Sequence, residues 1–529
     1  MAAPPVTGPP KGRPFLRFGF PCAVLALAAV GVAAVWAWPS AEWERANRVV
    51  CTGAAVMLAA LLLAVWLVFF SGLRRSLGLA ILLAVALVVL ASVRSVSFTG
   101  DMVPLVSFRW SPTQDDILEA YRQQQPDTPV PGPVETSSGG GTDFPEYRGR
   151  GRDGVVTGPP LARDWQARPP RLVWRHPVGG GYSAFAVAGN IAVTLEQRRS
   201  QEAVVCYDTA TGNERWQYAY PAYFTESLGG PGPRATPTVT GDDVFSLGAA
   251  GMLVCLDART GKPRWSVNIL DGNENVSWGM SGSPLVFDRV VVVNPGTQKE
   301  SARGRAVVAY DRATGKEAWA AGSARAGYSS PMLATLCGRR QVVLLDGEGL
   351  AGYDPEAHRE LWRFPWETQQ GINVAQPLVV DGNRVFISSG YGVGCAMLKV
   401  SEERGKWSVT PLWRNLFMRC KFTSPVAAKG FLYGLDEGIL VCLDQDSGTR
   451  RWKGGRYGHG QLLLADDLLL ILSESGSLVL VEANPEAPRE LGRLPVFDHK
   501  TWNCPALAGG RAFLRNDREM ACYELREPK

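Results

Sequence analysis

The stretch MLVCLDARTGKPRW, residues 252–265, decides the fold because the same layout recurs along the chain. Sharp copies are AVVCYDTATGNERW (203–216), AVVAYDRATGKEAW (306–319) and ILVCLDQDSGTRRW (439–452). Looser copies are LAGYDPEAHRELW (350–362), KWSVTPLW (406–413) and LVLVEANPEAPREL (478–491). In each sharp copy an apolar strand runs into Asp, a turn with Gly follows, and a second strand ends in Trp. Asp can accept bonds from the turn backbone and Gly supplies a positive φ, so every copy predicts a β-hairpin.

The spacing of the copies predicts a propeller. Counted from the tryptophan of RLVWRHPV (171–178), the intervals between copy ends are 42, 49, 54, 43, 51, 39 and 39 residues. One four-stranded blade per repeat has this period. We expect the recurring indoles to dock each blade on its neighbour: Trp174, Trp216, Trp265, Trp319, Trp362, Trp413 and Trp452.

A second marker gives the number of blades. A small or polar residue followed by Pro opens six inner strands, at Thr236, Ser283, Ser330, Gln376, Ser424 and Cys504. Residues 184–185 and 460–461 occupy the two remaining equivalent places, which makes eight. The last blade ends early, so we expect RLVWRHPV to supply its outermost strand and close the ring. The predicted fold is all-β, an eight-bladed β-propeller over residues 148–529.

Three apolar segments precede the propeller, at about Phe15–Trp38, Val49–Phe70 and Leu77–Val93. Each is long enough to cross a bilayer, which predicts three transmembrane helices within residues 15–95. Lys11, Arg13 and Arg17 precede the first segment, and an Arg pair fills the loop before the third. The positive-inside rule then predicts a cytoplasmic tail at residues 1–14 and a periplasmic propeller, in a multi-pass protein of the cytoplasmic (inner) membrane.

Residues 96–147 are predicted to be a periplasmic linker, partly disordered. This segment holds a short helix candidate, DDILEAYRQQQ (115–125), and then the run PDTPVPGPVETSSGGGT, which has little to bury. The formal charge of +5 and the lack of a basic cluster exclude nucleic acid as an expected partner. Of ten cysteines, four share one strand position (Cys206, Cys255, Cys442 and Cys522), which favours small buried side chains over disulfides or metal ligands.

The AxDxxTGxxxW repeat resembles the tryptophan-docking motif of quinoprotein (PQQ-type) eight-bladed propellers. One group with this motif is the quinoprotein alcohol and glucose dehydrogenases, and the other is the non-enzymatic group around BamB. As a whole chain, the sequence resembles membrane-anchored PQQ-like repeat proteins of the BamB-like kind. The resemblance implies either a site for PQQ and calcium with an Asp base, or a surface for envelope proteins or peptides.

Residues just before each inner strand should line the central funnel. Three residues ahead of the Pro position stand Tyr182, Arg234, Tyr328, Phe422 and Trp502, together with small or aliphatic residues; Lys421, His459 and Asn503 lie beside this ring. The ring lacks the carboxylates that calcium needs, so no catalytic residue, metal or cofactor is expected. Two interpretations of the aromatic and basic residues stay open: they fill the channel, or they bind a ligand.

The sequence therefore predicts a non-catalytic, membrane-anchored periplasmic propeller that acts as a protein- or ligand-binding scaffold in cell-envelope or outer-membrane protein assembly. The alternative is a PQQ-dependent, membrane-bound dehydrogenase that oxidises alcohols or sugars.

Overall fold

The computed structural model describes residues 19–38, 44–125, 132–137, 142–226, 228–296 and 304–527. These residues form two compact units, 1–112 and 113–529, which are described in turn. The predicted cytoplasmic tail, residues 1–14, lies outside the described residues, as does the beginning of the first predicted span.

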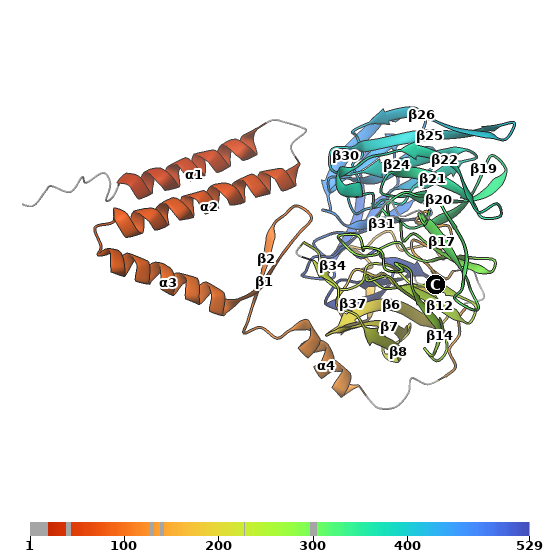
Figure 1. The fold of residues 1–529 in the computed structure, drawn as a ribbon, viewed down its shortest axis with the longest axis horizontal. Coiled ribbons are helices and arrows are strands. Elements are labelled where there is room, and N and C mark those ends of the chain that lie inside the picture. The colour runs from red at the N-terminus through yellow and green to blue at the C-terminus, as the bar shows by residue number, and fades with distance from the viewer. Residues whose placement is uncertain are drawn as a thin grey trace, which may run out of the picture. The chain divides into compact units, whose positions relative to one another are not determined.

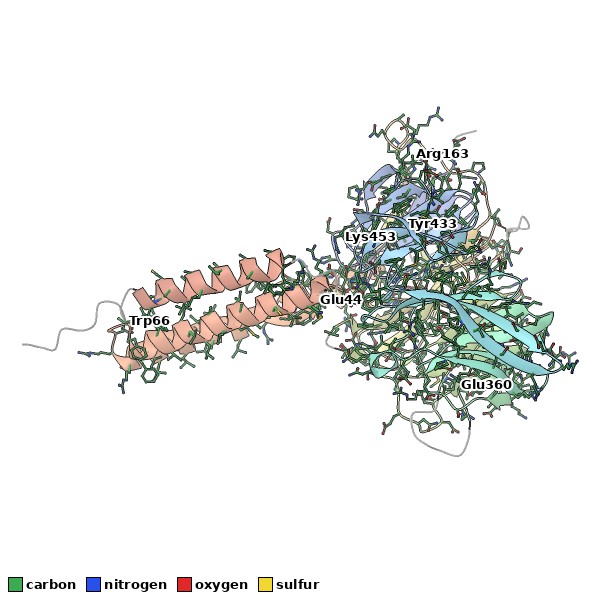
Figure 2. All side chains as sticks on the ribbon, turned by 90° about the horizontal axis from the view of Figure 1, so that it is seen from above. Glu44, Trp66, Arg163, Glu360, Tyr433 and Lys453 are labelled. Atoms are coloured by element: carbon green, nitrogen blue, oxygen red, sulfur yellow. The ribbon has the colours of Figure 1, made fainter. Side chains whose placement is uncertain are left out.

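The first unit contains three apolar helices, α1 (Phe20–Ala37), α2 (Arg45–Phe69) and α3 (Arg75–Ser92). All three are long and apolar enough to cross a membrane, as predicted. Figure 2 shows Glu44 and Trp66 towards opposite ends of α2. Its first turn adds Arg45 and Arg48 to the predicted apolar segment. A hairpin that the sequence had not revealed follows α3, made of β1 (Val93–Phe98) and β2 (Pro104–Phe108).

The second unit begins before the predicted boundary at residue 148. The helix candidate is confirmed as α4 (Gln114–Gln124), capped by Thr113 and Asp116. The Gln114 side chain donates to the carbonyl of Val178 at 2.8 Å. Within the predicted linker, the described residues 132–137 pair with the first blade, since the backbone N–H of Glu135 donates to Asn190 Oδ1 at 2.9 Å. Residues 126–131 and 138–141 lie outside the described residues.

Among the described residues, eight blade sheets confirm the predicted propeller, seven with four strands and one with five (Figure 1). Blade 1 contains β5 (Ala186–Ala188), β6 (Ile191–Arg198), β7 (Gln201–Asp208) and β8 (Glu214–Pro221), and blade 2 contains β11 (Thr238–Thr240), β12 (Asp243–Leu247), β13 (Met252–Asp257) and β14 (Pro263–Asn268). Blade 3 contains β15 (Leu285–Phe287), β16 (Val290–Val293), β17 (Val307–Asp311) and β18 (Glu317–Ala321), and blade 4 contains β19 (Met332–Leu336), β20 (Arg339–Leu345), β21 (Gly349–Asp354) and β22 (Arg359–Pro365).

Blade 5 contains β23 (Leu378–Asp381), β24 (Arg384–Ser389), β25 (Gly394–Glu403) and β26 (Lys406–Asn415), and blade 6 contains β27 (Val426–Ala428), β28 (Phe431–Asp436), β29 (Ile439–Asp444) and β30 (Arg450–Arg456). Blade 7 contains β31 (Gln461–Ala465), β32 (Leu468–Leu472), β33 (Ser477–Glu482) and β34 (Glu490–Pro495), and blade 8 contains β35 (Ala506–Ala508), β36 (Arg511–Arg515), β37 (Glu519–Glu524) and β4 (Arg171–Pro177). A short strand, β3 (Val155–Val156), joins β31 in parallel. The ring closes as predicted, because β4 pairs with β37 and sets Trp174 opposite Cys522.

The repeat motif acts at the blade interfaces. The Trp216 indole donates to the carbonyl of Ala258 in the next blade at 2.9 Å, and Trp265 does the same to Arg312. The turn glycine of the next blade packs against the face of the indole. A Cβ at Gly261 would lie 2.5 Å from the Trp216 ring, so no larger side chain fits there. The turn Asp accepts bonds from its own turn, and the hydroxyl and backbone N–H of Thr314 hold the pKa of Asp311 below its usual range. The four cysteines at the shared strand position are buried and free.

Blade 7 departs from the repeat because its outer strand carries Leu491 where the other blades have Trp. The structure supplies an indole from elsewhere. Trp165, which is 5% exposed, lies against the backbone of Gly492, and its Nε1 donates to the carbonyl of Ala162 at 2.8 Å. The segment before β4 therefore supplies the indole that covers blade 7.

Candidate ligand pocket on the propeller axis

A cavity of about 200 Å³ lies where the inner strands begin. Seven of the eight residues at the third position ahead of the Pro place line this cavity: Tyr182, Arg234, Ser281, Tyr328, Val374, Phe422 and Trp502. The eighth is Gly458, which has no side chain to contribute. The strands converge on the axis, so one position per blade brings residues far apart in sequence into one wall.

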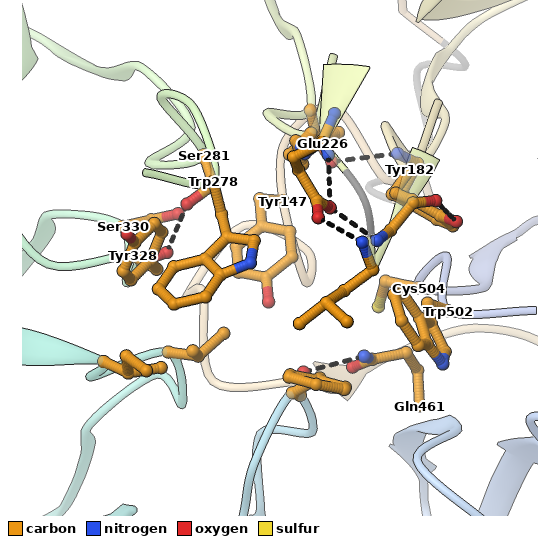
Figure 3. Close-up of a pocket in the computed structure, with 18 of the residues that line it drawn as sticks. Tyr147, Tyr182, Glu226, Trp278, Ser281, Tyr328, Ser330, Gln461, Trp502 and Cys504 are labelled. Carbon is orange, nitrogen blue, oxygen red and sulfur yellow. Dashed lines mark hydrogen bonds and ion pairs between the residues drawn. The ribbon is translucent and has the colours of Figure 1, made fainter. Parts of the chain in front are cut away.

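The wall is largely aromatic (Figure 3). The ring centroid of Trp502 lies 5.1 Å from that of Tyr182 and 4.9 Å from that of Phe422. On the other side Trp278 meets Tyr328 edge to face at 5.8 Å. The indole of Trp502 is held by a hydrogen bond from Nε1 to Glu474 at 2.8 Å, so this ring has a defined orientation. Burial raises the pKa of Tyr328 to about 12, which keeps its hydroxyl neutral.

A short hairpin brings the carboxylate of Glu226 to the cavity. No position of the repeat predicted this residue. The hairpin consists of β9 (Thr225–Glu226) and β10 (Gly230–Pro231). Glu226 lines the cavity and forms an ion pair with Arg234 at 3.1 Å. Its carboxylate also accepts the backbone N–H groups of Leu228 and Gly229, each at 2.6 Å. The two charges of the wall therefore neutralise each other before any ligand enters.

Three of the predicted funnel residues do not line the cavity. Lys421 is 4% exposed and forms an ion pair with Glu437 at 3.0 Å. His459 is buried behind Phe422, with 5.4 Å between the ring centroids. Asn503 donates to the carbonyl of Ser183 at 2.9 Å. These residues stand next to the lining position in sequence, and successive side chains of an extended chain point in opposite directions, so they face the blade interfaces.

The segment EYRGRGRDG, residues 146–154, lies beside the cavity. Tyr147 of this segment lines the cavity (Figure 3). Arg148 is fully buried and donates to the carbonyls of Ser424, Pro425 and Leu462 in blades 6 and 7. Arg152, also buried, donates to the carbonyls of Ser283, Pro284 and Pro331 in blades 3 and 4. We call residues 146–154 the axial plug, because its two guanidinium groups tie opposite sides of the ring.

The donor set of the cavity does not fit a calcium-bound quinone. Calcium takes six to eight oxygen ligands, several of them carboxylates. Of the described residues, those that line the cavity include one carboxylate, and Arg234 together with two backbone N–H groups already occupies it. In the described part of the chain, no three His, Cys, Asp or Glu side chains gather where they could hold a metal ion.

Comparison with known proteins shows which family the repeats resemble. A family model described as outer membrane protein assembly factor BamB matches residues 202–454. The propeller is built of PQQ-like repeats. The three apolar helices in front of the repeats fit membrane anchoring.

Two curated relatives match part of this chain. The quinohemoprotein alcohol dehydrogenase ADH IIB of Pseudomonas putida is 33% identical over 122 residues, 23% of this chain and 17% of that protein. The serine/threonine-protein kinase AfsK of Streptomyces griseus is 31% identical over 97 residues, 18% of this chain and 12% of that protein. The matched segments thus span less than a fifth of either relative.

Among solved structures, the quinohemoprotein alcohol dehydrogenase of Comamonas testosteroni superposes with a TM-score of 0.52 and 14% identity. The superposition covers 79% of this chain and 85% of that one. At this identity the similarity establishes a shared fold.

Proposed function

We propose that this chain is an integral protein of the cytoplasmic membrane whose PQQ-like propeller faces the periplasm and binds a ligand in the axial pocket without catalysing a reaction. The three apolar helices support the anchoring. The matched BamB family model supports a binding role among envelope proteins. The observation that carries the proposal is a preformed aromatic pocket in which the charged residues of the described lining, Arg234 and Glu226, neutralise each other.

The chemistry of the wall indicates what the ligand offers. Aromatic faces such as those of Trp502 and Phe422 bind flat rings and the C–H faces of sugars by stacking. Because Arg234 and Glu226 compensate each other, an uncharged group enters without leaving a buried charge unpaired. A sugar ring, or an aromatic side chain of a peptide segment from an envelope protein, meets both conditions.

The proposal is tested on the full chain in detergent micelles. A panel of neutral saccharides and aromatic-containing peptides is titrated while the unfolding temperature is recorded, since a ligand at a hundredfold excess over its Kd adds about 2.7 kcal/mol of stability. Trp502→Ala should abolish the response. Trp407→Ala, in the outer hairpin of blade 5 and outside the cavity lining, should leave it intact. A response that survives Trp502→Ala, or no response across the panel, would contradict the proposal.

The second candidate is a PQQ-dependent dehydrogenase, favoured by the segment shared with the Pseudomonas putida enzyme. Mixing the full chain with PQQ and calcium separates the two. Bound-quinone absorbance together with dye reduction by alcohols or sugars would establish the second candidate and overturn the first.

A further inference from the structure

The hairpin β1–β2 in the first unit has an apolar face and a second face that carries three serines and Leu105. Side chains alternate along each strand, and the register pairs Val96 with Val106 and Ser95 with Ser107. Val96 and Val106 thus share the apolar face with Phe108, and they are 43%, 47% and 39% exposed. On the other face the hydroxyls of Ser95 and Ser107 are hydrogen-bonded at 2.7 Å.

Hydrogen bonds fix the base of the hairpin to the last turn of α3. The backbone N–H of Arg109 donates to the carbonyl of Ser92 at 2.8 Å, and its Nε donates to the carbonyl of Leu90 at 3.2 Å. Arg94 in turn donates to the carbonyl of Arg109 at 2.7 Å. The hairpin is therefore a continuation of the helix end.

The turn of the hairpin reaches the start of α2. Asp101, which lies between β1 and β2, forms an ion pair with Arg45 at 3.2 Å. Because α2 and α3 are consecutive antiparallel spans, the first residue of α2 and the last residue of α3 lie at the same surface of a membrane. The hairpin connects these two helix ends (Figure 1), so its position along the membrane normal is that of the helix ends.

The side chains at this level are those that bilayer interfaces favour. Trp110 is 69% exposed and stacks on Phe108, with 4.8 Å between ring centroids and 6° between ring planes. Arg94 lies at the base of the hairpin, two residues before Val96. Aromatic rings together with Arg beside an apolar surface are typical of the headgroup region, where the rings bury apolar area and the guanidinium meets phosphate.

We propose that the β1–β2 hairpin is an interfacial membrane anchor, with Val96, Val106, Phe108 and Trp110 inserted between the lipid headgroups on the propeller side of the bilayer. The occupant of the apolar face is lipid, because the base of the hairpin is hydrogen-bonded to the last turn of α3, where Val89 and Leu90 are exposed. The proposal rests on the membrane anchoring proposed above and adds a fourth point of contact to the three spans.

The test uses spin labels on the full chain reconstituted in vesicles of phosphatidylethanolamine and phosphatidylglycerol. The accessible Cys22, Cys51 and Cys337 are first replaced by Ala. Single labels are placed at Val96→Cys and at its neighbour Ser95→Cys, which points to the opposite face. We expect the label at 96 to collide several-fold more with oxygen, which partitions into lipid, than with a water-soluble nickel chelate, and the label at 95 to show the reverse order.

Two outcomes would overturn the proposal: equal nickel accessibility at 95 and 96, which places the hairpin in water, or protection of 96 from both reagents, which places protein on the apolar face. A third label, at Val85→Cys in the middle of α3, tests the anchoring separately. Nickel access at 85 would refute the membrane span itself, whereas oxygen access at 85 with nickel access at 96 would refute the hairpin alone.

Discussion

The Trp174 indole donates its Nε1–H to the backbone carbonyl of Thr209 at 3.1 Å, and this bond joins the last blade of the propeller to the first. A Cβ at Gly212 would lie 2.6 Å from the same ring, so the contact is as close as those inside the repeat array. The two segments that it joins, β4 and the turn after β7, come from the beginning of the domain. The outermost strand of blade 8 therefore pairs with β37 on one side and docks on blade 1 through Trp174.

Trp174→Ala should lower the free energy of unfolding by about 3–5 kcal/mol, because it removes a buried indole and its hydrogen bond at the closure. The measurement is urea unfolding of the full chain in detergent, followed by far-ultraviolet circular dichroism. Trp407→Ala serves as the control because Trp407 is half-buried on an outer strand. Equal midpoints for the two variants would show that the closure contributes no special stability.

Arg152→Ala should cost several kcal/mol, since about 1–3 kcal/mol is lost for each buried acceptor left without a partner. The carbonyls of Ser283 and Pro331 lose their donor, whereas that of Pro284 keeps the hydroxyl of Thr238 at 2.6 Å. Arg150→Ala is the matched control in the same plug, because its side chain is 58% exposed and its partner Asp143 keeps the backbone N–H of Gly189. That change should cost less than about 1 kcal/mol. Thermal unfolding of both variants decides the matter, and similar losses would show that the buried guanidinium does not tie the blades.

Gly315→Ala should destabilise the propeller more than Gly405→Ala. Both glycines have positive φ, +69° and +81°. A Cβ at Gly315 would lie 2.6 Å from the Trp265 ring, whereas no heavy atom lies within 4 Å of a Cβ at Gly405. The control therefore measures the backbone cost, about 1 kcal/mol, and the excess at Gly315 measures the contact with the indole. Equal shifts of the urea midpoint would contradict this account of the repeat.

Asp346 should give the protein a pH-dependent stability. Burial raises the pKa of this carboxyl to about 6, although the Arg363 guanidinium, 2.9 Å away, acts in the opposite direction. Between about pH 4 and pH 6 the folded chain therefore binds more protons than the unfolded chain, and this carboxyl's contribution to the free energy of unfolding falls as pH rises. Relative to Asp346→Asn, the natural protein should lose roughly 2–3 kcal/mol over this range. A constant difference from pH 4 to pH 7 would refute the raised pKa.

Much of the pocket was predictable because it follows the repeat. Tyr182, Tyr328, Phe422 and Trp502 were expected at the axis from their offset to the inner strands, and they line the cavity. The loops were not predictable, since their lengths differ between blades and no repeat position aligns them. Glu226 and Trp278 reach the cavity from such loops.

The axial plug could not be predicted from the sequence either. Arg148 and Arg152 lie in a Gly- and Arg-rich stretch that reads as surface, yet both side chains are buried against carbonyls more than a hundred residues away. Their partners are backbone atoms, which leave no trace in side-chain identity. The sequence also did not show that Trp165 covers blade 7, because that indole lies outside the repeat.

By itself, the sequence determined the blade number, the tryptophan docking and the closure by residues 171–177, because a hairpin pattern repeated at a blade's length is typical of a ring in which each indole docks on the next blade. It also determined three apolar helices, since length and composition suffice for that. Tertiary structure alone decided that Trp278 and Glu226 join the predicted residues at the axis, how Glu226 neutralises Arg234, and how Arg152 ties the blades. Those contacts join residues brought together by the closed ring, and their geometry depends on loop conformations that no local pattern encodes.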